Sequence, residues 1–210
     1  NMTYSAYDYS ADARGYSWGL AGEWYRDNWV LRASRMLTPK DPNGRDLNWQ
    51  IFTAYGDQIE LERQHDIGDL PGKVAVLAYR NKMILARFQD ATNYLIQNNA
   101  QGQQTINNVR NNYQYKTGIG INAEQALADD MGVYMRAFTS DGHTETMSFT
   151  EADNSLSVGF SLDGVRWSRP KDTLGISMNV PPSGSAITVR AALRNHASNR
   201  GPIKPWRFGS

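Results

Sequence analysis

Residues 156–163, LSVGFSLD, decide the fold, because large apolar residues alternate strictly with small or polar ones. Leucine, valine, phenylalanine and leucine occupy the even positions, while serine, glycine, serine and aspartate occupy the odd ones. Successive side chains of a β-strand point to opposite faces. The segment therefore predicts a strand with one oily face and one wet face.

The same alternation recurs in residues 15–25 (GYSWGLAGEWY), 116–124 (KTGIGINAE) and 173–180 (TLGISMNV). An antiparallel sheet lying on a soluble core would alternate too. Here, however, the wet parity is rich in Gly, Ser and Asn rather than Lys and Glu, and aromatic residues stand near strand ends. This combination is typical of a membrane β-barrel that is oily toward lipid and polar toward a water-filled lumen.

Weaker patterns complete an all-β antiparallel meander of about nine strands up to Val180, joined by turns rich in Asp, Asn and Gly. The further strands are expected at residues 29–37, 57–64, 73–80 with a continuation at 83–88, 131–138 and 144–150, and the strand holding 116–124 is expected to start at Tyr113. Ten of the sixteen residues 97–112 are Asn or Gln, which are costly to bury. We expect a long polar loop near residues 89–112, with a helical turn at 90–96.

The composition limits the class of protein. At 210 residues the chain is one domain or a large part of one, and it has no cysteine and no apolar run of about 18 residues for a membrane-spanning helix. The three histidines have no zinc-ligand spacing, and no G-x-S-x-G motif is present. Glu60 and Glu62 lie on one strand face and cannot flank a glycosidic bond. We expect no enzyme, no metal and no cofactor.

Charge is unevenly distributed along the chain. Residues 173–210 contain five basic residues and no acidic one, whereas residues 1–172 contain 17 basic and 21 acidic residues. The basic residues are too sparse for a nucleic-acid surface, so no nucleic-acid partner is expected. The first residues show no basic region followed by an apolar run, so no signal peptide is expected and the chain is taken as mature or internal.

Several segments resemble the carbohydrate-selective outer-membrane porins, the OprB family, over roughly residues 8–178. The order and spacing of the matching segments are more specific than any one of them. They are residues 11–19 (ADARGYSWG), 23–25 (EWY), 29–32 (WVLR), 55–62 (YGDQIELE), 71–74 (PGKV), 77–81 (LAYRN), 129–142 (DDMGVYMRAFTSDG), 149–153 (FTEAD), 155–157 (SLS) and 166–175 (RWSRPKDTLG).

The resemblance implies a Gram-negative outer-membrane channel for passive, carbohydrate-selective diffusion of sugars such as glucose. Its expected partners are small sugars and outer-membrane lipid, and homo-oligomerisation stays open. Members are about twice as long as this chain, and an aqueous channel needs about 16–18 strands. We therefore expect residues 1–180 to form part of such a barrel and residues 181–210 to form an irregular basic tail that does not match the family.

Strand parity selects the residues expected to line the pore and contact sugar. Arg32, Arg80 and Arg136 are preferred as lumen arginines, because an arginine at mid-strand would cost about 2–4 kcal/mol facing lipid. Sugars present hydroxyls on their rims and C–H groups on their faces, so the candidates combine charged, amide and aromatic groups, bound weakly enough for release. They are Glu23, Arg32, Glu60, Glu62, Arg80, Lys116, Asn122, Glu124, Tyr134 and Arg136. The alternative for each is a structural charge pair away from any constriction.

Aromatic residues leave two interpretations open. Tyr134 and Phe138 share the parity of Arg136 and either stack on sugar or pack under an inward loop. Trp18, Trp24, Trp29 and Trp167 are expected at the membrane interface.

Two other classes of protein compete with a porin. A soluble β-sandwich or lectin-like sugar-binding module would need a closed apolar core. A non-channel structural barrel differs from a porin only in transport.

Overall fold

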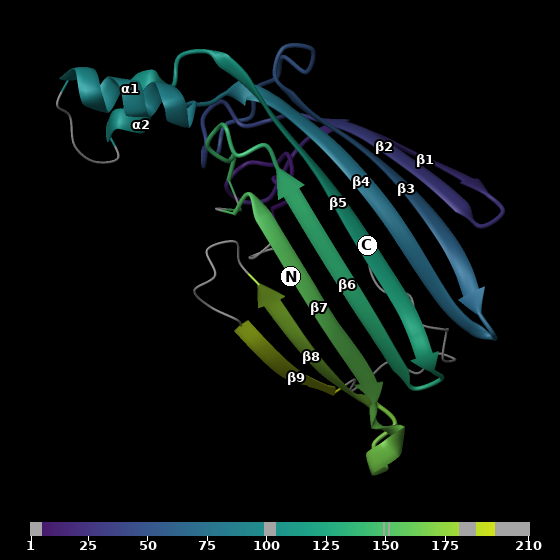
Figure 1. Ribbon diagram of the computed structural model, residues 1–210. Coiled ribbons are helices and arrows are strands. Elements are labelled where there is room, and N and C mark those ends of the chain that lie inside the picture. The colour runs from purple at the N-terminus through teal and green to yellow at the C-terminus, as the bar shows by residue number, and fades with distance from the viewer. Residues whose placement is uncertain (1–5, 99–103, 149, 151, 181–187, 196–210) are drawn as a thin grey trace.

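The computed structural model describes residues 6–98, 104–148, 150, 152–180 and 188–195 (Figure 1). It contains one nine-stranded sheet in which every strand pairs antiparallel with the next in sequence. The predicted all-β meander is therefore confirmed, and the β-sandwich alternative is wrong because the described strands form one sheet. The strands are β1 (Gly19–Arg26), β2 (Trp29–Met36), β3 (Tyr55–Ile67), β4 (Leu70–Ile84), β5 (Tyr113–Ala128), β6 (Met131–Ser140), β7 (Asn154–Asp163), β8 (Asp172–Val180) and β9 (Thr188–Asn195).

The strand expected at residues 15–25 begins only at Gly19, and the continuation expected at 83–88 ends at Ile84. Two further predictions about strands are wrong. Residues 144–150 were expected to form a strand, but their described part makes only an isolated bridge, between Thr144 and Arg87. Conversely, β9 lies inside the segment 181–210 that was expected to be irregular. β9 pairs with β8. This pairing uses backbone hydrogen bonds, so it does not require an alternating sequence in β9.

The connection between β4 and β5 is more helical than expected. The predicted helical turn is the longer helix α1 (Phe88–Asn98), and a second helix, α2 (Gln104–Val109), lies within the Asn- and Gln-rich run. Both helices project from one end of the sheet in Figure 1. No helix in the described part of the chain is long and apolar enough to cross a bilayer.

The two ends of the sheet differ in their connections. At one end the strands are joined by the tight turns 27–28, 68–69 and 129–130 and by a short segment with the 3-10 helix η2 (Gly164–Trp167). At the other end lie the longer connections 37–54, 85–112 and 141–153. Outer-membrane barrels have short periplasmic turns and longer extracellular loops. We refer to the two ends as the turn end and the loop end.

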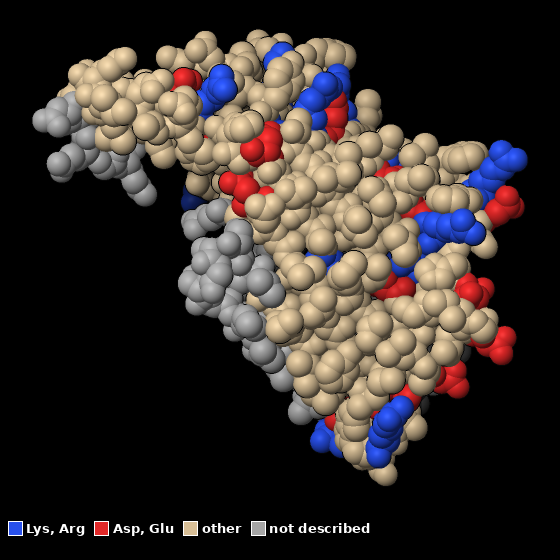
Figure 2. All heavy atoms as spheres, viewed as in Figure 1, with Lys and Arg blue, Asp and Glu red and all other residues tan. Residues whose placement is uncertain are grey.

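The two faces of the sheet also differ, as the alternation predicts. The outer face is apolar and exposed, with Ile59, Leu61, Val76 and Ile121 all between 41% and 51% exposed. Figure 2 shows a broad area without charged groups over the strands, with most charges at its borders. The inner face carries Gly, Ser, Asn and charged residues, and residues 6–17 pack on part of it.

Apolar burial is accordingly small. Met83, Leu85 and Met147 form a buried hydrophobic cluster, located where β4 leads into the loop end. Many other buried side chains are polar, including Asn81, Lys116 and Asn179. An arrangement with its oily face outward needs a surrounding apolar solvent, as a lipid-embedded sheet does.

Candidate functional site

Two groups of charged residues lie on the inner face. The first, the Arg32 group, joins β1, β2 and β3. The Arg32 guanidinium lies 2.7 Å from Glu60, 2.9 Å from Glu62 and 3.4 Å from Glu23. One cation thus holds three carboxylates, and the group is acidic overall.

The second, the Arg136 group, joins β4, β5 and β6. Arg136 donates from Nε to the Asn122 amide oxygen at 3.0 Å, and its Nη2 lies 3.6 Å from Glu124. The Lys73 ammonium reaches the other Glu124 oxygen at 3.4 Å. Two cations share one carboxylate, so this group is basic overall.

Strand register places the two groups side by side on the inner face. Glu62, Ala75, Asn122 and Arg136 are successive cross-strand partners from β3 to β6. Neighbouring strands are about 4.8 Å apart. The small Ala75 separates the acidic group from the basic one, so a transverse field runs along this row.

Aromatic rings flank the Arg136 group. The Arg136 guanidinium carbon lies 5.5 Å from the centre of the Tyr134 ring. Phe138 lies two positions further along the same strand face, and its ring stacks on Tyr7 at 5.8 Å. The inner face thus offers ring surfaces beside bidentate hydrogen-bonding groups.

Residues 6–17 form a part of this face that sequence reasoning missed. The Tyr79 hydroxyl donates to the Ala6 carbonyl at 3.0 Å, and Asn81 donates to the Asp8 carbonyl. Tyr7 packs edge-on against Tyr79 and donates to Gln58. The alternation gives no signal for this packing, because residues 6–14 lie outside every predicted strand and residues 15–17, expected in the first strand, precede β1.

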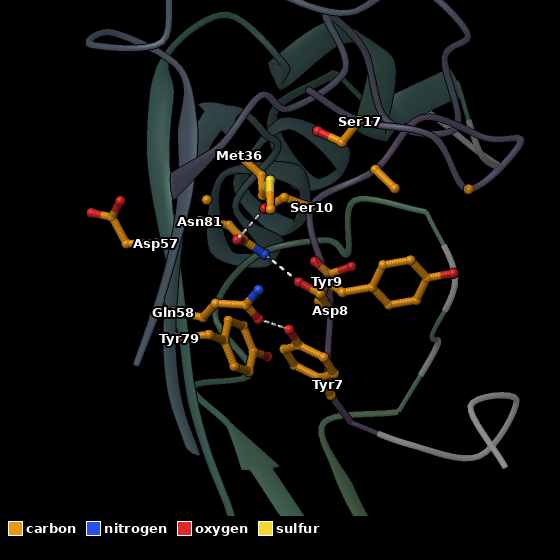
Figure 3. A pocket seen from close by; sticks show the side chains of 13 residues that line it. Tyr7, Asp8, Tyr9, Ser10, Ser17, Met36, Asp57, Gln58, Tyr79 and Asn81 are labelled. Atoms are coloured by element: carbon orange, nitrogen blue, oxygen red, sulfur yellow. Dashed lines mark hydrogen bonds between the residues drawn. The ribbon is translucent and has the colours of Figure 1, made fainter. Parts of the chain in front are cut away.

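A cavity of about 380 Å³ lies between this segment and strands β3 and β4. Figure 3 shows Tyr7, Tyr9, Gln58, Tyr79 and Asn81 around it, while Asp57 points away from it. Its walls combine tyrosine rings with amide and hydroxyl groups. Such a lining suits a hydroxylated solute as well as ordered water.

Asp8 anchors the segment to the loop end. Its Oδ2 accepts a hydrogen bond from the Met147 amide at 2.8 Å, while its Oδ1 has no hydrogen-bond partner among the described residues. Burial raises the pKa of the Asp8 carboxyl from 3.8 to about 6. Asp12 differs, because hydrogen bonding to the Arg14 guanidinium lowers the pKa of its carboxyl.

Eight of the ten candidate residues share the inner face, in the two charged groups and beside them, and their role in lining a pore stays a prediction: Glu23, Arg32, Glu60, Glu62, Asn122, Glu124, Tyr134 and Arg136. Lys116 shares this face but is fully buried. Its ammonium lies 3.2 Å from the Thr144 carbonyl and 3.0 Å from Asp153, so it fastens a loop and cannot meet a solute.

Arg80 was expected in the lumen and lies on the opposite face. It is the cross-strand partner of Asp57, in the parity of Val76 and Ala78. The prediction assumed that an arginine would be too costly on the lipid side. The cost of placing this arginine on the lipid side is reduced in two ways. The Arg80 guanidinium lies 3.0 Å from Asp57, and its side chain is half exposed near the loop end.

Comparison with known proteins places this geometry in a family. Residues 1–205 match the family described as "Carbohydrate-selective porin, OprB family". The chain belongs to the carbohydrate-selective porin family. The match runs past Val180, so the expectation that residues 181–210 do not match this porin family is wrong up to residue 205.

A solved structure agrees with this assignment. The chain is similar in fold to the high-pH structure of Pseudomonas putida OprB, with a TM-score of 0.56 at 17% sequence identity. The likeness covers 78% of this chain and 39% of that one. No curated protein sequence matches the chain significantly. As a member of this porin family, the chain is a portion of an outer-membrane β-barrel.

Proposed function

We propose that the protein lets sugars diffuse passively across the outer membrane, without a chemical step, and that the inner face described above lines their path. The family assignment and the polar inner face support this function. Small sugars are the proposed solutes, and the surrounding lipid is the proposed environment of the apolar outer face.

The Arg136 group is the observation that carries the proposal. A guanidinium, an amide and a carboxylate lie within 3.6 Å of one another beside the Tyr134 ring. Planar guanidinium and carboxylate groups hydrogen-bond paired hydroxyls, and a ring face accepts the C–H face of a sugar. The group is partly open to solvent at Arg136, whose side chain is 35% exposed, so binding can stay weak enough for release.

A structural barrel without a channel is the second candidate. It draws support from residues 6–17, which lie on the inner face with Tyr7 stacked on Phe138. A segment in that position narrows a lumen. Only transport distinguishes a narrowed channel from a closed one.

Planar-bilayer conductance of the complete barrel of which this chain forms a portion, with glucose and maltose titrated in, tests the proposal. We expect steady channels that both sugars partly block. Arg136→Gln should weaken the sugar block several-fold, because it removes the bidentate donor. Arg166→Gln is the matched control, since Arg166 pairs with Asp130 at the turn end and lies outside the proposed path. Channels indifferent to sugar would refute carbohydrate selectivity, and the absence of channels would favour the structural barrel.

A further inference from the structure

A cluster of cations and tyrosine rings lies on the outer face at the loop end. One cross-strand row runs from Arg35 through Asp57 to Arg80. The next outer-face row toward the loop end runs from Tyr55 through Lys82 to Tyr115. These six residues are named the boundary cluster.

Asp57 holds the two arginines in place. Arg35 donates to the Asp57 carboxylate from Nε at 2.7 Å and from Nη2 at 2.8 Å. Arg80 donates to Oδ2 of the same carboxylate at 3.0 Å. An arginine has five N–H donors. Asp57 accepts hydrogen bonds from two donors of Arg35 and from one of Arg80, so each guanidinium has further donors that Asp57 does not use.

Tyrosine rings support the cations from the sheet side. The Arg35 guanidinium carbon lies 4.2 Å from the centre of the Tyr55 ring, and that of Arg80 lies 5.6 Å from it. The Lys82 ammonium lies 5.5 Å from the centre of the Tyr115 ring and 5.8 Å from that of Tyr113. Cation–π contacts of this length orient a cation without neutralising it.

The boundary cluster keeps an excess of positive charge. It has three cations and one carboxylate, and Lys82 makes no ion pair among the described residues. Asp141, a further carboxylate at the loop end, is engaged elsewhere, because it accepts hydrogen bonds from the backbone N–H of Thr117 and from that of His143. Among the described residues only Asp57 forms ion pairs with the cations of the cluster, so the excess charge is available to an anion from outside.

The position of the cluster determines which anion can reach it. The adjoining outer-face row toward the turn end is apolar and contains Ile59, Ala78 and Ile119. On its other side the cluster is followed by the connections of the loop end. In a membrane barrel this is the border between hydrocarbon and the headgroup layer on the loop side, where lipid phosphates lie.

We propose that the boundary cluster binds the phosphate of an anionic lipid headgroup at the loop-side border of the barrel. Arg80 and Lys82 supply the charge, Arg35 and Asp57 position Arg80, and the exposed Tyr115 ring packs on the adjoining acyl and sugar or glycerol groups. The inference rests on the proposed function only in requiring a barrel embedded in a membrane, and it does not depend on sugar transport.

Lipid retention tests the proposal. The protein is folded into nanodiscs of phosphatidylcholine with or without phosphatidic acid, transferred to detergent, and its bound lipids are counted by native mass spectrometry. We expect retention of phosphatidic acid over phosphatidylcholine. The double variant Arg80→Gln/Lys82→Gln should lose about tenfold of that preference, and the charge-conserving Arg80→Lys/Lys82→Arg should keep most of it.

The matched control is Arg26→Gln/Arg63→Gln, which removes the same charge from the same face at its turn-end border. Equal loss in both double variants, or no preference in the original protein, would overturn the proposal. Release of the lipid by excess inorganic phosphate would also overturn it, because the site would then take a phosphate ion rather than a headgroup. Sugar-blocked conductance is measured in parallel. A lipid preference without sugar block would refute only the transport function.

Discussion

The Phe138 ring lies directly against the backbone of Gly120, its cross-strand partner on the inner face. A Cβ atom on Gly120 would overlap the ring carbons. Tyr134 has the same relationship to Gly159. A ring that lies against a glycine covers the glycine backbone, which would otherwise be exposed on this face.

Gly120→Ala should therefore tilt the Phe138 ring and destabilise the sheet. We expect a loss of about 1–3 kcal/mol in the free energy of unfolding, as for overpacking elsewhere, measured by urea unfolding in detergent. The matched control is Gly175→Ala on the inner face of β8, where an added Cβ meets no atom within 4 Å. Equal effects of the two substitutions would show that strand propensity rather than the ring contact sets the cost.

These pairs explain why the sequence predicts the faces well. Glycines at the inner-face positions fit a polar lumen and also leave space for aromatic rings from neighbouring strands. The alternation of residues 156–163 and 116–124 therefore predicts the two faces of these strands correctly. Tyr134 and Phe138 looked anomalous on that parity because the pattern shows one strand at a time. Their partners Gly159 and Gly120 lie on other strands, and only the register joins them.

The parts that were missed depend on tertiary contacts rather than alternation. Arg80 was placed by the cost of a lone charge in lipid, and its partner Asp57 lies on the neighbouring strand. In the sequence, residues 144–150 (TETMSFT) place Glu, Met and Phe between Thr and Ser, yet the described part hydrogen-bonds to Asp8 and Lys116 instead of to a strand. Residues 6–17 are likewise held by long-range hydrogen bonds, from Tyr79 to Ala6 and from Asn81 and Met147 to Asp8.

Arg32→Gln should make the channel more cation-selective. The substitution leaves Glu23, Glu60 and Glu62 without the cation that lies within 3.4 Å of all three. We expect a several-fold rise in the permeability ratio of K⁺ to Cl⁻, from reversal potentials in a salt gradient. Arg166→Gln removes one charge at the turn end and should change the ratio little. An unchanged ratio in Arg32→Gln would show that the Arg32 group does not face the ion path.

Asp8→Asn should stabilise the protein at neutral pH but not in acid. The folded pKa of Asp8, about 6, lies above its unfolded value of 3.8. The folded state therefore binds more protons between these pH values, and its stability falls as pH rises through this window. The amide variant avoids the buried charge while its oxygen can still accept the Met147 N–H. Its advantage should be present above pH 6 and vanish below pH 4, by thermal unfolding.

Asp12→Asn is the contrasting variant, because the pKa of Asp12 is lowered in the folded state. Its carboxylate contributes stability that is present above the unfolded pKa and is lost as pH falls through the folded pKa. Asp12→Asn should therefore weaken the protein at neutral pH, and the difference should disappear in strong acid. Parallel pH profiles for the two variants would contradict both assignments.

Lys116→Met should lower stability without changing the sugar block. The ammonium is fully buried and bonds to the Thr144 carbonyl and to Asp153, so its loss leaves a buried carbonyl unpaired and a carboxylate without its cation. Because Asp153 is 35% exposed and also accepts from Ser140, we expect a cost of about 1–3 kcal/mol rather than that of a fully buried pair.

Lys73→Met provides the opposite pattern. Lys73 is 25% exposed and pairs with Glu124 at 3.4 Å in the Arg136 group, so its removal should cost less stability and should alter the sugar block. Measuring unfolding and sugar-blocked conductance for both variants separates a loop fastener from a solute-contacting cation. If Lys116→Met changed the sugar block and Lys73→Met did not, both assignments would be wrong. Lys116 would then contact the solute and Lys73 would not.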